Sequence, residues 1–162
     1  MNYNSLTDFI TALEALKANL PTLITPHVSK AGVALSSAVI NRVVTKGVDD
    51  NGVKFSPYSA KHKIKRKRVG HAPFGTQGSM KNFYMTGTMW TNFGVRKVSV
   101  DGERVLSTID FIGSNVYTNN KELAEIHEDN EGRSLTTPTQ AEEDDFVMDL
   151  AESIVEIIKS RL

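Results

Sequence analysis

The sequence predicts an α+β domain in which two N-terminal helices and a C-terminal helix pack on a small antiparallel β-sheet. Apolar residues recur at helical spacing near both ends of the chain, and between them two segments alternate apolar and polar residues around an Asp-Gly pair. A chain of 162 residues, 40% of them hydrophobic, can bury one core without disulfides, and this chain has no cysteine. We therefore expect a single domain spanning residues 1–162.

The N-terminal quarter of the chain predicts two helices. Ser5 or Thr7 can cap the first helix, and Pro21 is expected to end it. The second helix is expected to start near Pro26, which suits a first helical position, and to end at Gly47. Its long stripe of residues at helical spacing comprises Val28, Ala31, Leu35, Ala38, Val39, Arg42 and Val43.

The next segment, residues 48–82, predicts a basic, loop-rich extension within the domain. It opens with an Asp-Asp-Asn-Gly turn at 49–52, and its last part, 69–82, carries three glycines and a proline typical of a loop. Between these lie six basic side chains within eight residues, which form the main candidate interaction site: Lys61, Lys63, Lys65, Arg66, Lys67 and Arg68. We expect this basic run to contact an acidic protein surface or DNA, and to become ordered only when such a neighbour is present.

A β-hairpin follows the extension. Residues 95–100 and 103–112 alternate in polarity, and Asp101-Gly102 between them suits a type I′ turn. The preceding segment, 86–90, predicts a compact turn or short helix. Trp90, the only tryptophan, is expected to anchor the core beneath the hairpin and the C-terminal helix.

The last third of the chain predicts two more helices. Asn119 or Asn120 can cap a short one, which Gly132 ends. For the final helix, Thr137 is the expected N-cap and Pro138 the first helical residue. Its expected buried stripe comprises Phe146, Val147, Leu150, Ala151, Ile154, Ile157 and Ile158.

Charge is divided unequally along this neutral chain. Residues 42–104 hold 13 Lys/Arg and 4 Asp/Glu, whereas residues 105–162 hold 4 Lys/Arg and 13 Asp/Glu. A basic and an acidic patch on one molecule can pair head to tail between copies, and such contacts make rings when the rotation closes. The expected acidic counter-surface comprises Glu122, Glu125, Glu128, Asp129 and Glu131.

Residues with catalytic or metal-binding potential do not form a recognisable pattern in this sequence. The four histidines lack a metal-ligand spacing, no Gly-x-Ser-x-Gly is present, and the acidic pairs are adjacent in sequence. We therefore expect no enzyme activity, cofactor or metal. The start of the chain lacks a basic region, and we see no apolar run of about 20 residues, so we expect neither a signal peptide nor contact with a membrane.

The order of these segments resembles the virion-morphogenesis proteins of tailed bacteriophages, also called tail-completion or head–tail joining proteins. The resemblance covers roughly residues 30–162, with Phe55 where tryptophan is common in the family. It rests on an aromatic-x-Pro-Tyr-Ser segment leading into lysines, a Thr-Gly turn with a bulky residue after it, the hairpin, an Ala-x-x-His segment and an Arg-x-Leu segment. The residues that carry it are Phe55, Pro57, Tyr58, Thr86, Gly87, Trp90, His127 and Arg133.

The resemblance implies a non-enzymatic subunit of a ring at the virion neck, which joins portal and head to the tail around the DNA path. The implied partners are further copies of the chain, portal or adaptor proteins and tail proteins, with non-specific contact to packaged DNA. The implied location is the neck of the virion, after synthesis in the host bacterial cytoplasm.

Two other interpretations stay open at this point. The basic run 61–68 also fits a small protein that binds double-stranded nucleic acid without sequence preference. In that case the isolated monomer would bind DNA in a salt-dependent manner, whereas a connector would form a discrete ring with little affinity for DNA. A hydrolase with an unrecognised site is the third interpretation.

Overall fold

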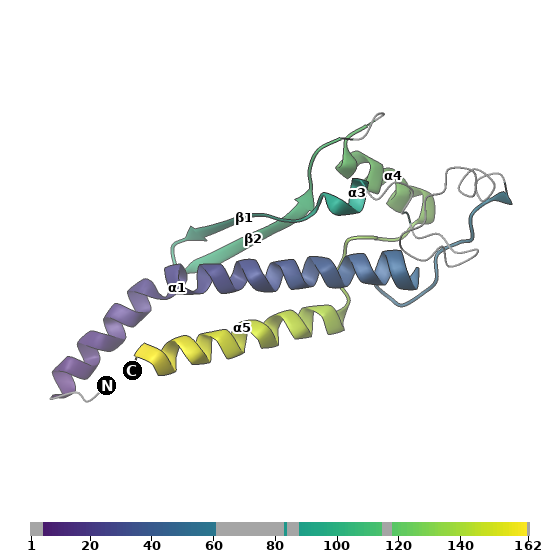
Figure 1. The fold of residues 1–162 in the computed structure, drawn as a ribbon. Helices are drawn as coiled ribbons and strands as arrows, with labels where there is room; N and C mark the ends of the chain where they lie inside the picture. Colours follow the sequence, from purple (N-terminus) through teal and green to yellow (C-terminus); the bar gives the residue numbers. More distant parts are fainter. Residues whose placement is uncertain (1–4, 61–82, 84–87, 115–117, 162) are drawn as a thin grey trace.

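The computed structural model describes residues 5–60, 83, 88–114 and 118–161, and it confirms the α+β class. Its elements are the helix α1 (Leu6–Ile40), the π-helix η1 (Asn41–Lys46), the single-turn helix α3 (Thr88–Thr91), the strands β1 (Phe93–Asp101) and β2 (Arg104–Phe111), and the helices α4 (Asn120–Glu131) and α5 (Gln140–Arg161). The molecule is elongated, and α1 runs along it between the hairpin on one side and α5 on the other (Figure 1).

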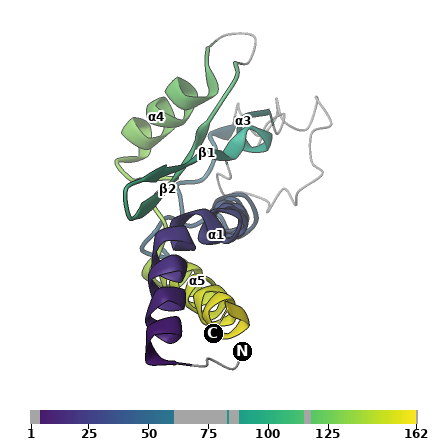
Figure 2. The same cartoon turned by 90° about the vertical axis from the view of Figure 1, so that its left-hand side faces the viewer.

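The two expected N-terminal helices are one helix. Ser5 caps it, because its hydroxyl accepts a hydrogen bond of 3.1 Å from the amide of Asp8. Pro21 and Pro26 both lie inside α1, where each lacks the N–H that would bond to the preceding turn. The helix therefore bends instead of stopping, and its N-terminal part points away from the direction of the rest (Figures 1 and 2). We call this part, residues 6–20, the N-terminal arm.

The hairpin forms where the sequence predicts it, but its turn is shifted by one residue. Asp101 pairs with Arg104, so the central residues of the turn are Gly102 and Glu103. Only Gly102 has a positive φ, of 59°, whereas a type I′ turn needs positive values at both central residues. Glycine at the first central position is the pattern of a type II′ turn, so the expected type I′ turn is wrong.

The hairpin approaches α1 closely through a small-residue face of that helix. A Cβ atom added at Gly32 would lie 2.8 Å from Cγ2 of Val95 and 3.2 Å from Oγ of Ser107. One turn further along the helix, Ser36 is buried next to Gly94. Glycine at position 32 therefore sets the distance between the helix and the sheet.

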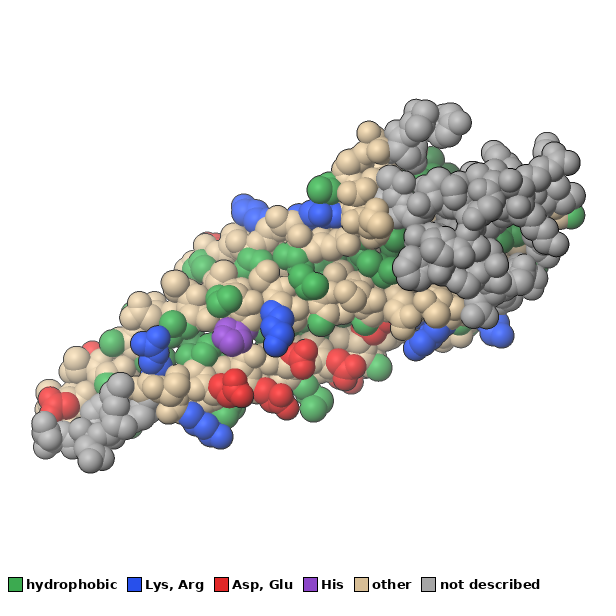
Figure 3. All heavy atoms as spheres, viewed as in Figure 1, with side chains coloured by type: hydrophobic (Ala, Val, Ile, Leu, Met, Phe, Trp, Pro, Cys, Tyr) green, Lys and Arg blue, Asp and Glu red, His purple; other side chains and the backbone are tan. Residues whose placement is uncertain are grey.

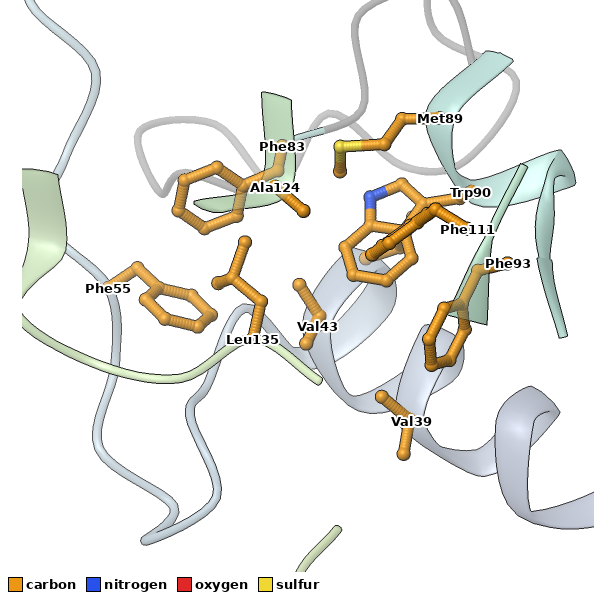
Figure 4. Close-up of a cluster of buried hydrophobic side chains, with 11 residues drawn as sticks. Val39, Val43, Phe55, Phe83, Met89, Trp90, Phe93, Phe111, Ala124 and Leu135 are labelled. Carbon is orange, nitrogen blue, oxygen red and sulfur yellow. The ribbon is translucent and has the colours of Figure 1, made fainter. Parts of the chain in front are cut away.

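The hydrophobic core lies in the part of the molecule that holds α3 and α4, away from the two termini (Figure 1). It surrounds the junction of η1, α3, α4 and the base of the hairpin (Figure 4). Trp90 is buried there, with its ring centroid 5.9 Å from that of Phe93 and 5.7 Å from that of Phe111. The expected core role of Trp90 is thus confirmed. The expected contact of Trp90 with the C-terminal helix is wrong, because no residue of α5 belongs to this core.

The two C-terminal helices differ in how well the sequence predicts their starts. Asn119 caps α4 and Gly132 follows its end with a φ of 64°, as expected. The cap of α5 is Thr139, two residues beyond the expected Thr137. The Thr139 hydroxyl accepts from the amide of Glu142 at 3.1 Å, and a carboxylate oxygen of Glu142 accepts from the amide of Thr139 at 2.8 Å. This reciprocal pair is a capping box.

Candidate interaction surfaces

The basic run lies outside the described residues, so its side chains stay a sequence-based prediction. The structure does place the residues on either side of the segment 61–82. The amide of Phe83 donates a hydrogen bond of 3.1 Å to the hydroxyl of Tyr58, and the rings of Phe55 and Phe83 meet edge to face with centroids 4.9 Å apart. The chain therefore enters and leaves the segment at the same place, beside the core.

Phe83 occupies this position in an unfavourable backbone conformation. Its φ of 51° lies in the left-handed region, which is unusual for a bulky residue and costs about 1–2 kcal/mol. The side chain is nevertheless buried, between Phe55 and His127, whose ring centroid is 5.0 Å from that of Phe83. Burial of an aromatic ring offsets the backbone strain, so Phe83 anchors the C-terminal side of the extension.

The residues that carry the family resemblance converge on the core and its rim. Phe55 and Trp90 are buried in it, and Tyr58 and His127 contact it through Phe83. Thr86 and Gly87 lie outside the described residues, and Pro57 is exposed. Arg133 stands at the rim of the core, where its guanidinium donates to the carbonyl of Lys54 at 3.1 Å.

Arg133 belongs to a small network that holds the turn at 49–52. Asp49 is buried, and its Oδ1 accepts from the amides of Asn51 and Val53 at 3.0 and 2.8 Å. Its other oxygen, Oδ2, lies 3.5 Å from Nη1 of Arg133. The buried carboxylate thus has two backbone donors and one cation, which satisfies a charge that would otherwise be costly to bury.

A second buried pair joins the end of α1 to the start of α5. The guanidinium Nε of Arg42, within η1, lies 3.1 Å from a carboxylate oxygen of Glu142, and the two side chains are only 6% and 12% exposed. Arg42 also donates to the carbonyls of Val48 and Thr137, at 3.3 and 2.6 Å. The sequence offers no local signal for this pair, because its members are 100 residues apart.

The five acidic residues expected to form a counter-surface fall into two groups. Glu122, Glu128 and Glu131 accept hydrogen bonds within the chain: Glu122 from Asn119 and Thr118, Glu128 from the loop 134–136, and Glu131 from Ser56. Glu125 and Asp129 are exposed on α4. Glu122 is exposed as well, but the structure gives hydrogen bonds only to the first group, so Glu125 and Asp129 are the exposed carboxylates of the predicted counter-surface without a hydrogen bond given within the described residues.

Glu128 organises the loop between α4 and α5. A single carboxylate oxygen accepts from the Leu135 amide at 2.7 Å, from the Thr136 amide at 3.2 Å, and from the hydroxyls of Ser134 and Thr136 at 3.0 and 3.2 Å. These contacts hold Leu135 in the core, where it is fully buried. Glu128 therefore has a structural role that its place in an acidic run does not reveal.

We expect Glu128→Ala to lower the free energy of unfolding by about 1–3 kcal/mol, because it leaves partly buried amides and hydroxyls without an acceptor. The matched control is Glu125→Ala on the exposed side of the same helix, which we expect to change stability by less than about 0.5 kcal/mol. Urea denaturation followed by far-UV circular dichroism measures both values. Equal losses for the two variants would contradict the role given to Glu128.

The C-terminal helix does not bury the stripe predicted from its sequence. Phe146, Leu150, Ile154 and Ile157 are half-buried, whereas Val147, Ala151 and Ile158 are exposed, and no residue of α5 is fully buried. Met148 is 61% exposed and Val155 46% exposed. Green apolar side chains accordingly reach the surface along this part of the molecule, beside a row of red acidic ones (Figure 3). Apolar positions cover more of the helix than its neighbour α1 can cover.

The described residues offer no metal site, because no three His, Asp or Glu side chains within 5–60, 83, 88–114 and 118–161 are grouped to hold an ion. The continuous helix Leu6–Lys46 is long and apolar enough to cross a membrane, judged by length and composition alone. A core helix passes the same criterion, and Val28, Ala31 and Val39 of α1 are buried inside this fold. Comparisons of the chain with protein-family models, with curated proteins and with solved structures find no match.

Proposed function

We propose that this chain is a structural subunit of the neck of a tailed bacteriophage, where copies form a ring that connects the portal and head to the tail around the DNA path. The observation that carries the proposal is that α5 packs on α1 on one side only and leaves apolar side chains exposed on another. The helix α5 has 22 residues and no fully buried side chain, and its exposed apolar residues form a surface that a neighbouring subunit can cover.

The resemblance in the order of motifs is what selects a phage neck among assemblies. Its residues Phe55, Tyr58, Trp90 and His127 meet around one core, so the motifs have a common structural purpose. In the proposed assembly this core end carries the basic run into contact with an acidic neighbour surface or with DNA. The exposed carboxylates Glu125 and Asp129 are available for such a contact.

Reversing the charge of the basic run tests the proposal. We expect a variant with Lys65, Arg66, Lys67 and Arg68 replaced by Glu to fold with nearly unchanged stability. The sequence predicts that this run faces solvent in the isolated chain, and charges in solvent contribute little stability. The same variant should block completion of particles. The measurement is the titre of infectious virions after complementation with the variant, with thermal denaturation of the purified protein as the folding control.

A normal titre with the reversed run would show that these residues are only a solvated surface. The nucleic-acid-binding alternative predicts a different result, namely salt-dependent binding of duplex DNA by the wild-type monomer that the reversal abolishes. An antibody label or an electron density at the virion neck decides whether the chain is a virion component at all.

A further inference from the structure

We propose that the subunits associate through the N-terminal arm of one copy, which lies on the outer face of α5 of the next copy. This inference deepens the proposed ring and rests on its claim of self-association. The outer face is the exposed apolar side of α5, formed by Val147, Met148, Ala151, Val155 and Ile158. The arm is residues 6–20.

The arm presents an apolar stripe that its own chain leaves exposed. Leu6, Ile10 and Leu13 are 74%, 47% and 38% exposed, and they follow the spacing of four and three residues that places side chains on one side of a helix. A neighbouring stripe, formed by Phe9, Ala12, Leu16 and Leu20, is half-buried. The fold of the isolated chain therefore does not bury the exposed stripe.

The outer face of α5 has the complementary pattern. Met148, Ala151, Val155 and Ile158 are spaced by three, four and three residues, which is the spacing of the seam between two packed helices. The half-buried residues of α5, such as Leu150 and Ile157, lie on a different side of the helix. One copy cannot cover both sides with its own α1, so the outer face needs a helix from elsewhere.

Charge indicates which helix that is. The polar side of α5 carries Asp145, Asp149, Glu152 and Glu156, so pairing α5 with α5 of another copy would bring two acidic surfaces together. The arm has only Asp8, Glu14 and Lys17 and is nearly neutral. An arm-to-α5 contact thus buries apolar surface and opposes fewer like charges than α5 against α5, because the arm has one lysine against two acidic residues. The contact is heterologous, the type that forms rings when the rotation closes.

A membrane is the other class of surface that an apolar arm could meet. Helices that lie on membranes carry many Lys and Arg on their polar side, and the arm has one lysine, which contacts Glu103 of its own chain at 3.5 Å. The bend at Pro21 and Pro26 turns the arm out of the line of the rest of α1, so that the arm lies at the end of the elongated molecule where the two chain termini meet (Figures 1 and 2). These observations favour a second copy of the chain.

Two variants that each damage one side of the contact provide the test. Ile10→Glu should prevent arm docking and Val155→Glu should damage the outer face. Each should sediment as a monomer with the far-UV circular dichroism spectrum of the wild type, since both side chains are exposed in the isolated chain. Mixed in equal amounts, they should form dimers and nothing larger, because each pair then has one intact arm and one intact outer face. Thr11→Glu, on another side of the arm, should assemble like the wild type.

Because the chain lacks cysteine, disulfide trapping can locate the contact directly. Under oxidising conditions Ile10→Cys combined with Val155→Cys should give a ladder of linked oligomers, and Thr11→Cys combined with Val155→Cys should not. The inference is wrong if both cysteine pairs give the same ladder or if neither gives one. It is also wrong if Ile10→Glu alone still assembles. Flotation of the wild-type protein with phospholipid vesicles, lost in Ile10→Glu, would instead show that the arm binds a membrane. A ladder from a protein that is absent from virions would instead reject the neck function and keep the contact.

Discussion

Trp90→Ala should lower the free energy of unfolding by about 3–5 kcal/mol, the usual cost of emptying a core aromatic site. Trp90 is 2% exposed and contacts the rings of Phe93 and Phe111 at the base of the hairpin. The lost ring leaves a cavity where α3, the hairpin and η1 meet. Urea denaturation followed by circular dichroism measures the loss.

Trp90→Phe is the matched control for this prediction. The indole Nε1 is buried without a hydrogen-bond partner in the described part of the chain, so losing its N–H removes no bond. The phenyl ring keeps part of the packing, and we expect a smaller loss than with alanine. A loss below about 1 kcal/mol for Trp90→Ala, together with failed assembly, would place this side chain at a subunit interface instead of the core.

Arg42→Met should be comparably damaging, at about 3–5 kcal/mol, because it leaves the buried Glu142 carboxylate without its cation. It also removes the donor to the carbonyls of Val48 and Thr137, which hold the start of α5 against the end of α1. The matched control is Lys17→Met, which breaks the pair with Glu103, whose side chains are 76% and 83% exposed. That change should cost no more than about 1 kcal/mol.

The double variant Arg42→Met with Glu142→Gln distinguishes a buried pair from simple loss of packing. Removing both charges should cost less than the sum of the two single losses, because neither charge is then left unpaired. Additive losses would show that the two residues act independently, in contradiction to the contact described here.

The elements that the sequence predicts well depend on local signals. The structure confirms three helix ends that the sequence predicts from single residues. Two of them are side-chain caps, Ser5 and Asn119, and the third is Gly132, which adopts a left-handed conformation after α4. The start of α5 was missed although Thr139 and Glu142 have the spacing of a capping box, because the Thr-Pro pair before them resembles an equally good start.

Other features depend on contacts that no local pattern reveals. Pro21 predicts a helix end, yet α1 continues past it, with half-buried Leu20 and Leu23 on either side, and the helix bends there instead of ending. The stripe of α5 predicts burial, but helical spacing cannot say whether the cover comes from the same chain or from a neighbour. Similarly, Glu128 belongs to an acidic run in the sequence and to a loop contact in the fold.

In the proposed neck assembly, copies of this chain close into a ring. Electron microscopy of the purified protein, negatively stained, tests it most directly. We expect the wild-type chain to form closed rings of a single diameter with a central opening, and Ile10→Glu to form none. Fields that contain only monomers, or open filaments with no closed particles at any concentration, would contradict it.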